Sequence, residues 1–230
     1  MAGTLWASPE GWVSPQAVTA YTPPVAAPLP IIRAPMAATQ VPRPFHHPGW
    51  VYEEKVDGWR ALAYKNAAGV RLISRNGRQL TRRFPELAAA VAELAPPTLV
   101  LDGEIAVFDQ QLVSRFEWLR GRPKDDTATP PLLMAFDCLY ARGKDLRKRP
   151  LRVRRNVLEE LVDGQRLVLP ARRLAADGLE AWAQVLSRGY EGLVGKDEAS
   201  AYVEGRTLSW LKVKVPHYRE GARGWEPKKS

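Results

Sequence analysis

A lysine and an aspartate stand two residues apart in the run Glu53-Glu54-Lys55-Val56-Asp57-Gly58-Trp59-Arg60. Side chains alternate along an extended segment, so Lys55 and Asp57 share one face. Gly58 would let the backbone turn or come close to a ligand, and Arg60 adds a permanently charged fork that suits phosphate. We expect Lys55 to act as a nucleophile that takes up a phosphoryl or nucleotidyl group. For a lone Lys-x-Asp-Gly, the alternative is a surface strand with a salt bridge.

Two further segments carry charges that a phosphate or a metal could use. The turn Ser74-Arg75-Asn76-Gly77-Arg78 projects two arginines, either as an ordinary basic hairpin or as a phosphate or ribose contact. In the apolar run 99–105, Asp102 and Glu104 flank a glycine. Carboxylates in such a run are costly unless they are paired or bound to a metal. Magnesium held together with nucleotide phosphates usually takes one or two carboxylates, so a functional role is favoured over a solvated strand edge.

The remaining segments carry an aromatic residue and several lysines. Phe136 lies in an apolar run and, taken alone, would be a core residue. Lys212 and Lys214 share one face of a strand. Two lysines that close repel each other unless both are well solvated or an anion lies between them. The segment 191–196 begins with a glutamate and ends with a lysine. Beside these residues, a triphosphate site explains the paired lysines Lys212 and Lys214 better than a solvated surface strand does.

Taken together, these segments resemble the covalent nucleotidyltransferases, which are the ATP-dependent DNA ligases, the RNA ligases and the messenger-RNA capping enzymes. The chain most resembles the adenylation domain of the bacterial ATP-dependent DNA ligases associated with end joining. The resemblance covers residues 31–216 in the family's order. Its motifs are Glu54-Lys55-Val56-Asp57-Gly58-Trp59-Arg60, Ser74-Arg75-Asn76-Gly77, Asp102-Gly103-Glu104, Phe136-Asp137, Glu191-Gly192-Leu193-Val194-Gly195-Lys196 and Lys212-Val213-Lys214.

The resemblance implies a role for each matched residue. Lys55 would attack the α-phosphate of ATP and form a lysyl-adenylate. Glu104 and Glu191 would hold Mg²⁺ or Mn²⁺, with Asp57 and Asp102 near the metal or the ribose. The other implied nucleotide contacts are Phe136 stacked on adenine, Arg60 and Arg75 on the ribose or phosphates of nucleotide or nucleic acid, Lys196, Lys212 and Lys214 on the α-phosphate, and Glu53 elsewhere on the nucleotide.

A lysine nucleophile also fits elementary acid–base chemistry. An ordinary lysine, with a pKa of about 10.4, is protonated at neutral pH and attacks poorly. Neighbouring cations such as Lys196 and Lys212, together with a bound metal, would favour the neutral amine and stabilise charge in the transition state. Arginine could not take its place, because the guanidinium proton effectively cannot leave.

The order of apolar runs and turn residues predicts an α+β fold with mostly antiparallel sheets flanked by helices, and the resemblance implies an ATP-grasp-like nucleotidyltransferase domain. Residues 1–48 hold half of the 20 prolines. We therefore expect a Pro-rich extension at 1–30, an adenylation domain at 31–216 that starts with extended chain, and a polar tail at 217–230. The expected helices are 85–94, 116–119, 151–161 and 177–187. The expected strands are 49–55, 59–65, 70–74, 132–140, 167–170, 192–196 and 211–215, with 98–102 and 105–108 as a pair broken at Gly103.

The net charge of +9 and the pI of about 9.8 favour a polyanionic partner. Nucleic acid is favoured over a membrane, because no basic amphipathic helix stands out and no apolar stretch approaches the roughly 18 residues of a spanning helix. The single cysteine, Cys138, excludes an intrachain disulfide, and we expect the protein in the cytoplasm. Nicked double-stranded DNA is the expected partner, bound through the basic segments 75–83 and 142–155.

The resemblance leaves two questions open. In the family an OB-fold domain follows this one, and residues 217–230 are too few for five strands. We expect either an excised catalytic domain or a ligase without the second domain, with an OB-fold domain in trans and other end-joining or repair proteins as further partners. The alternatives to a DNA ligase are an RNA ligase or capping-type enzyme, and a catalytically idle module that binds nucleic-acid ends. The idle module predicts loss of the nucleophile or the metal carboxylates, and all of them are present.

Overall fold

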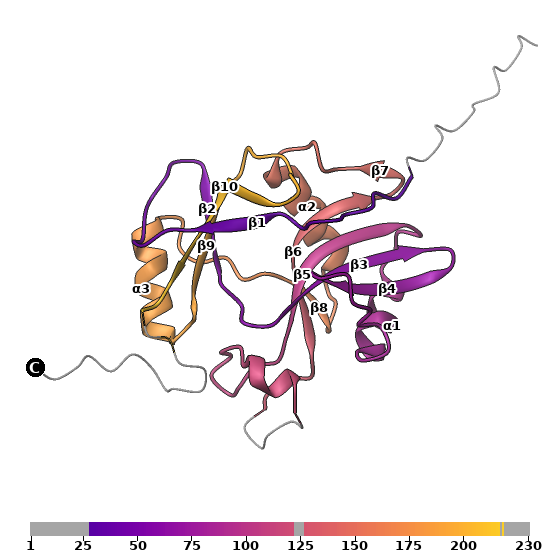
Figure 1. Cartoon of the computed structure of the whole chain (residues 1–230), viewed down its shortest axis with the longest axis horizontal. Coiled ribbons are helices and arrows are strands. Elements are labelled where there is room, and N and C mark those ends of the chain that lie inside the picture. Colours follow the sequence, from indigo (N-terminus) through magenta and orange to yellow (C-terminus); the bar gives the residue numbers. More distant parts are fainter. Residues whose placement is uncertain (1–27, 122–126, 217, 219–230) are drawn as a thin grey trace, which may run out of the picture.

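The computed structural model describes residues 28–121, 127–216 and 218. Two sheets built mostly from antiparallel strand pairs carry the helices on their outer faces (Figure 1). This architecture confirms the predicted α+β fold. Residues 1–27, 217 and 219–230 lie outside the described part of the chain, so most of the expected Pro-rich extension and all of the expected tail except Tyr218 fall there.

The four-stranded sheet has the order β1-β10-β9-β2. Its strands are β1 (Ala37–Gln40), β2 (Trp50–Glu54), β9 (Gly192–Asp197) and β10 (Arg206–Lys214), and β1 pairs with β10 in the parallel sense. Helix α3 (Gly178–Arg188) covers one face of this sheet through a cluster that includes Ala181, Val185 and Leu193 (Figure 1). The Asp177 carboxylate caps the helix by accepting the backbone N–H of Leu179 at 2.8 Å.

The six-stranded sheet has the order β4-β3-β5-β6-β7, with β8 added in parallel beside β6. Helices α1 and α2 pack on it, and a short 3₁₀ helix, η1, follows β5. The bounds of these elements are β3 (Trp59–Asn66), β4 (Gly69–Ser74), α1 (Pro85–Glu93), β5 (Leu99–Ala106), η1 (Phe116–Leu119), β6 (Leu132–Ala141), β7 (Lys144–Asp145), α2 (Leu151–Val162) and β8 (Val168–Pro170).

The two faces of the six-stranded sheet have different tasks. One face buries Ala61, Leu101 and Ile105 in the main core beneath the helices. The opposite face follows the alternation of strand side chains and buries Leu62 and Val100 in a second cluster that reaches the four-stranded sheet. The polar side chains of the site therefore project from the face that looks toward the other sheet.

The structure corrects three expectations about the strands. β5 runs unbroken from 99 to 106, with a register shift at Gly103 instead of a break. A Cβ atom at Gly103 would lie 2.8 Å from the backbone oxygen of Met134, so the glycine permits close pairing with β6. β10 begins at Arg206, five positions earlier than the predicted 211, because its first half is polar and pairs with β1, a strand that was expected only as extended chain.

Candidate active site

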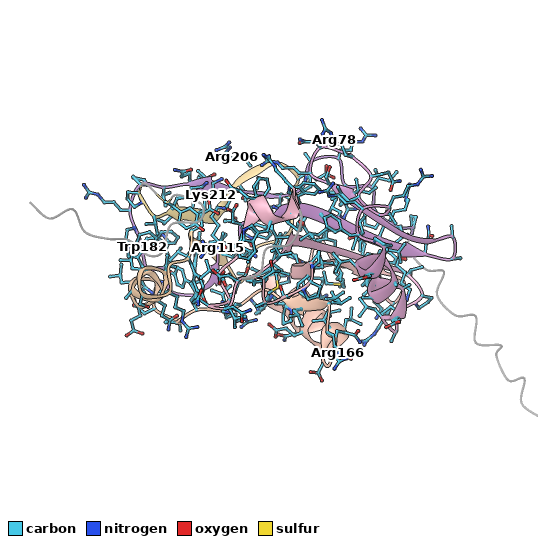
Figure 2. All side chains as sticks on the ribbon, turned by 90° about the horizontal axis from the view of Figure 1, so that it is seen from below. Arg78, Arg115, Arg166, Trp182, Arg206 and Lys212 are labelled. Carbon is cyan, nitrogen blue, oxygen red and sulfur yellow. The ribbon has the colours of Figure 1, made fainter. Side chains whose placement is uncertain are left out.

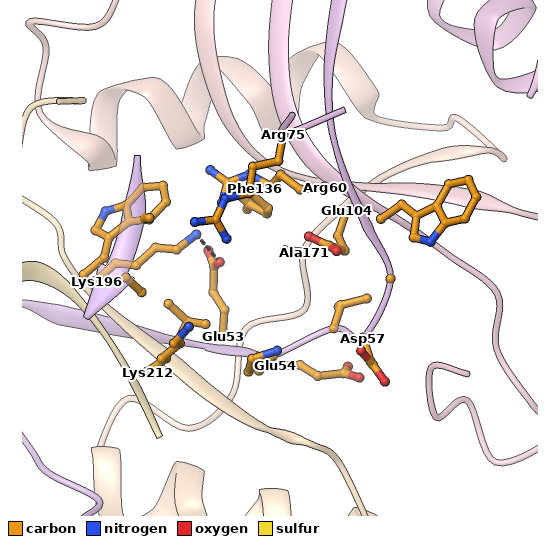
Figure 3. Close-up of a pocket in the computed structure, with 18 of the residues that line it drawn as sticks. Glu53, Glu54, Asp57, Arg60, Arg75, Glu104, Phe136, Ala171, Lys196 and Lys212 are labelled. Carbon is orange, nitrogen blue, oxygen red and sulfur yellow. Dashed lines mark hydrogen bonds and ion pairs between the residues drawn. The ribbon is translucent and has the colours of Figure 1, made fainter. Parts of the chain in front are cut away.

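A pocket of about 480 Å³ opens between the two sheets. Figure 3 shows side chains from both sheets converging on it. Its lining includes these residues of the predicted site: Glu53, Lys55, Asp57, Arg60, Arg75, Glu104, Phe136, Lys196 and Lys212. The volume lies in the range of small-molecule sites, so the fold brings most of the predicted residues together around a space that can hold a nucleotide.

Lys55 lies where the chain crosses from one sheet to the other. Strand β2 ends at Glu54, and the backbone N–H of Lys55 donates to the oxygen of Gly192 at 2.9 Å. The crossing passes very close to β5, since a Cβ atom at Gly58 would lie 2.2 Å from the backbone oxygen of Ile105. Gly58, which was predicted to allow a turn or a close ligand, thus allows two backbone segments to come close together. This close approach helps to hold Lys55 in the lining of the pocket.

Glu191 links two lysines at the edge of the pocket. Its Oε2 accepts a hydrogen bond from Nζ of Lys55 at 2.5 Å, and its Oε1 lies 2.7 Å from Nζ of Lys214. Burial, and then the nearby charges of Lys55 and Lys214, lower the pKa of Lys212. The group in contact with Lys55 is therefore a carboxylate. Lys212 and Lys214 lie around this pair, and their positive charges suit an anionic ligand.

The carboxylate of Glu104 faces the same space. Burial raises its pKa to about 7, against the lowering effect of Arg60 and Lys55. A carboxylate in this position gains from an added cation. Among residues 28–121, 127–216 and 218, no group of three or more His, Cys, Asp or Glu side chains is arranged to hold a metal ion, so an ion here would also need oxygens from its ligand.

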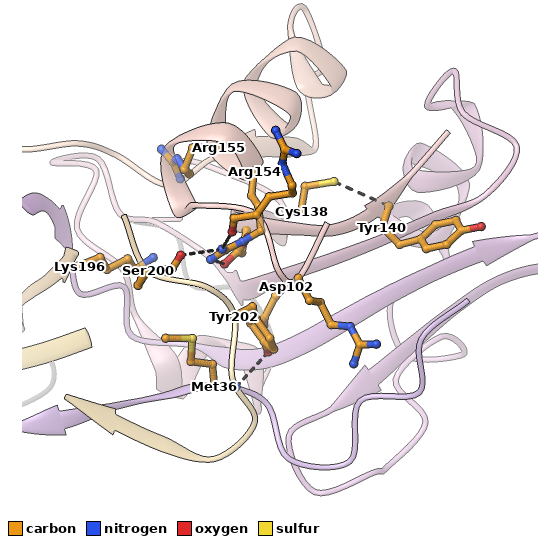
Figure 4. A network of polar contacts seen from close by, with 12 residues as sticks. Met36, Asp102, Cys138, Tyr140, Arg154, Arg155, Lys196, Ser200 and Tyr202 are labelled. Carbon is orange, nitrogen blue, oxygen red and sulfur yellow. Dashed lines mark hydrogen bonds and ion pairs between the residues drawn. The ribbon is translucent and has the colours of Figure 1, made fainter. Parts of the chain in front are cut away.

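Asp102 and Arg60 form a closed pair beneath the pocket (Figure 4 labels Asp102). Both oxygens of the fully buried Asp102 receive the Arg60 fork at 2.6 Å, and Tyr202 donates to Oδ2 at 2.7 Å. Arg60 also donates to the backbone oxygen of Met36 at 2.8 Å. Both oxygens of Asp102 are therefore engaged, and Asp102 positions Arg60. The guanidinium of Arg60 lies 4.6 Å from the ring centroid of Phe136.

A bulge explains why Phe136 is only partly buried against the core and lines the pocket. Asp102 pairs with Asp137 and Gly103 with Ala135, so Phe136 has no partner across the strand pair. Bulges near active sites re-aim side chains, and here the ring lines the pocket.

Lys196 lies between aromatic rings and a carboxylate. Its Nζ is 4.3 Å from the Phe136 ring centroid and 4.4 Å from that of Trp210, and it donates to Oε2 of Glu53 (Figure 3). Burial is the main cause that lowers the pKa of Lys196. Glu53 and Lys196, each expected from the resemblance to contact the nucleotide, therefore pair with each other and line the pocket together.

Sequence reasoning assigned no role to several residues of the pocket. Trp210 and Arg206 line it beside Lys212, and Glu54 lines it next to Lys55. Burial raises the pKa of Glu54 to about 7, although Arg172 contacts it at 2.8 Å. The signal available was the consecutive pair of glutamates at the end of an apolar strand, which is unusual in a buried segment.

The structure also separates the two segments expected to bind DNA. In the segment 142–155, Arg154 and Arg155 are buried, so the expectation that they contact DNA is wrong. Arg142 pairs with Glu160 and Arg147 with Asp145 on the surface. By contrast, Arg75 and Arg206 are exposed and line the pocket, and Arg78 and Arg82 are exposed in the segment that follows β4.

Figure 2 places Arg78 and Arg206 on one side of the molecule and Arg166 on the opposite side. Lys212, labelled in the same view, comes from the strand that also carries Arg206. The pocket therefore opens beside a cationic margin. No helix in the described residues is long and apolar enough to cross a membrane.

Comparison with known proteins shows the family to which the chain belongs. Residues 33–214 match the family model described as ATP dependent DNA ligase domain. A relative from Mycobacterium tuberculosis, the multifunctional non-homologous end joining DNA repair protein LigD, is 38% identical over 166 residues, which are 72% of this chain and 21% of LigD. DNA ligase C1 of Mycolicibacterium smegmatis is 33% identical over 204 residues, which cover 83% of this chain and 58% of that protein.

A solved structure shows the same fold. The crystal structure of the ligase domain of M. tuberculosis LigD aligns with a TM-score of 0.69 and 36% identity, covering 79% of this chain and 59% of that one. A mycobacterial DNA ligase D complexed with ATP and MES aligns with a TM-score of 0.68 and 35% identity, covering 79% of this chain and 60% of that one. Since the family model spans most of the chain and the pocket holds its motifs, the chain belongs to the family of ATP-dependent DNA ligase catalytic domains.

Proposed function

We propose that this chain activates ATP through Lys55 and passes the AMP group to the 5′-phosphate at a break in DNA. A 3′-hydroxyl then bonds to that 5′-phosphate and AMP leaves, which seals the strand. The observation that carries the proposal is the position of Lys55, which lines the pocket with its Nζ 2.5 Å from a carboxylate that can receive its proton. The family and the ATP-bound mycobacterial ligase D support ATP as the substrate.

In the first step, the nitrogen of Lys55 forms a bond to the α-phosphorus of ATP and the bond to pyrophosphate breaks. Glu191 takes the proton that Lys55 releases. Lys212 and Arg75 line the same pocket as Lys55 and would bind the phosphates whose charge increases as pyrophosphate leaves. In the second step, a 5′-phosphate oxygen bonds to the same phosphorus and the bond to Lys55 breaks.

We assign a divalent metal, Mg²⁺ or Mn²⁺, to the carboxylates of Glu104 and Glu191. Glu104 fits the assignment, since its pKa is raised by burial and a cation would offset that cost. Glu191 fits it less simply, because both of its oxygens already face lysines. When bound with the phosphates, such an ion would neutralise charge on them.

DNA is the proposed polymer because the named relatives are DNA ligases and because exposed arginines border the pocket. The relatives described as end-joining proteins support end joining as the setting, and because the proposed reaction consumes ATP and acts on DNA, we propose the cytoplasm as its location. The chain covers 21% of the LigD relative, so partner proteins and the preferred break remain part of the proposal.

The test is covalent labelling. The chain is incubated with α-³²P-labelled ATP and magnesium and then run on a denaturing gel. We expect a labelled band with the native chain and none with Lys55→Arg, because the guanidinium keeps its proton. Lys65→Arg is the matched control and should label normally, since Lys65 donates to the backbone oxygens of Ala92 and Leu94 outside the pocket. A normal band from Lys55→Arg would refute the assignment of the nucleophile.

The same gel separates the alternatives. Labelling by GTP instead of ATP would favour a capping-type enzyme, and transfer of the label to nicked RNA but not to nicked DNA would favour an RNA ligase. Absence of label with either nucleotide, together with binding of DNA ends, would favour the catalytically idle module.

A further inference from the structure

We propose that Arg155, a buried arginine of α2 behind the pocket, is a positioning residue for nucleotide binding, which it serves by holding the Glu53–Lys196 pair in the pocket wall. The inference rests on the proposed function, because it assigns the pocket to a nucleotide. It reverses the expectation that this arginine contacts DNA.

The contacts of Arg155 lead from the surface of α2 to the pocket. The side chain is 1% exposed, and its Nη1 lies 3.1 Å from Oε1 of Glu53. Its Nη2 donates to the backbone oxygen of Ala171 at 3.1 Å and lies 3.2 Å from the carboxylate of Glu159. Glu53 in turn accepts a hydrogen bond from Lys196 at its other oxygen. Three of these residues, Glu53, Ala171 and Lys196, line the pocket, whereas Arg155 does not.

The charge balance shows what Arg155 contributes. Glu53 is buried between two cations, so each of its oxygens faces one of them. Neither Oε1 of Glu53 nor Nη1 of Arg155 makes an aligned hydrogen bond. The attraction between the Arg155 guanidinium and the Glu53 carboxylate therefore holds that side of the carboxylate in place. Without the cation, Glu53 would be free to rotate toward Lys196 and draw the ammonium away from the ligand. A buried carboxylate needs such compensation.

The neighbouring residue Arg154 provides a matched comparison. It is equally buried, but it contacts Asp137 through Nε and Nη2 at 2.8 Å and the backbone oxygen of Ser200 at 2.9 Å (Figure 4). None of these partners lines the pocket. Adjacent arginines of one helix therefore serve different tasks, one for the fold and one for the pocket wall.

The test measures the dissociation constant of α,β-methylene-ATP, which cannot release pyrophosphate, by calorimetry on the full chain, with the melting temperature measured alongside. We expect Arg155→Met to weaken binding about tenfold, and Arg155→Lys, which keeps the charge but loses the fork, about threefold. Arg154→Lys should lower the melting temperature and change the dissociation constant by less than about twofold. In a Glu53→Gln background, the Arg155 variants should add less than about twofold, because the residue acts through Glu53.

Equal weakening by Arg154→Lys, unchanged binding in the Arg155 variants, or full additivity with Glu53→Gln would overturn the inference. If Arg155→Met does not fold, Arg155→Lys and its double variant decide the question. Failure of the proposed function has a different signature, because a native chain that binds the analogue but forms no AMP adduct refutes the reaction and leaves the binding series intact. A native chain that does not bind the analogue refutes both.

Discussion

The ion pairs at the pocket edge differ from the ion pairs beneath it in how completely they are satisfied. At the edge, Glu191 holds Lys55 and Lys214, and Lys214 is 42% exposed. Beneath it, Arg154 and Asp137 are 0% exposed, and the arginine fork is filled by a carboxylate and backbone oxygens. The first arrangement can exchange partners with a phosphate or a metal, whereas the second cannot without loss of buried hydrogen bonds.

This difference shows which charges belong to the fold and which to the chemistry. Breaking a closed, buried pair leaves an uncompensated charge away from water. Glu191 is itself buried, but it has two cationic partners, Lys55 and Lys214, which are 19% and 42% exposed, so breaking one pair leaves the carboxylate compensated by the other and the cost falls mainly on ligand binding. The same kinds of residue thus give opposite outcomes on mutation, and this contrast can be tested.

The largest expected effect concerns the closed pair. Arg154→Met removes the partner of buried Asp137 and should lower the free energy of unfolding by about 3–5 kcal/mol, measured by urea denaturation. The double variant Arg154→Met/Asp137→Leu, which removes both charges, should recover most of that loss. A loss below about 1 kcal/mol in the single variant would mean that this pair is not closed in solution.

The open pair should respond in activity instead. Glu191→Gln keeps the shape of the side chain but removes its charge, so we expect formation of the AMP adduct to fall about 100-fold or more. The melting temperature should change little. The matched control is Glu160→Gln, which breaks the surface pair with Arg142 and should leave adduct formation unchanged. A large drop in melting temperature with normal adduct formation would mark Glu191 as a structural residue.

Local patterns, together with the family resemblance, were enough to predict most of the charged residues that line the pocket. The residues Lys55, Arg75 and Glu104 each lie in short motifs whose spacing is legible without the fold, and the fold class followed from the order of the runs. The assigned roles and the domain boundaries stay predictions. What local spacing could not reveal is pairing over long distances, since Glu191 and Lys55 are 136 positions apart.

The arginines of α2 show the same limit from the other side. A basic helix looks solvated when only its composition is read. Arg154 and Arg155 are buried because Asp137 and Glu53, from two different sheets, supply carboxylates at the right depth. Phe136 is a similar case, because only the skipped position opposite β5 turns its ring toward the pocket. Register and tertiary charge compensation cannot be obtained from a single sequence.

An intermediate case is Glu54, which is buried and paired with Arg172 but keeps one oxygen without a hydrogen-bond partner. Burial raises its pKa to about 7 in the folded protein, so the folded state binds the proton more tightly than the unfolded state does. Stability should therefore decrease as the pH rises from about 4.5 through 7, on the order of 1–3 kcal/mol. The free energy of unfolding at pH 5.5 and 8 measures this change, and Glu54→Gln should make the difference smaller. An unchanged difference would exclude Glu54 as its source.

The smallest free-energy change per residue is expected at the exposed arginines, where the comparison extends to DNA. Phosphate contacts release counterions, so the logarithm of the affinity for nicked duplex should fall linearly with the logarithm of the salt concentration. Replacing Arg75, Arg78 and Arg206 with glutamine should flatten that slope by about 2–3 units.

The matched control removes the same number of charges from the segment that the structure sets aside, by replacing Arg142, Arg147 and Arg152 with glutamine. Arg142 and Arg147 already face carboxylates, so they have less positive charge to offer a phosphate, and the slope should stay near that of the native chain. Fluorescence anisotropy with a labelled nicked duplex, measured across a series of salt concentrations, gives both slopes. If the two triple variants flatten the slope equally, net charge alone governs binding. If only the second does, the DNA lies over the segment 142–155 and away from the mouth of the pocket, and the distinction between exposed and paired arginines does not predict the DNA path.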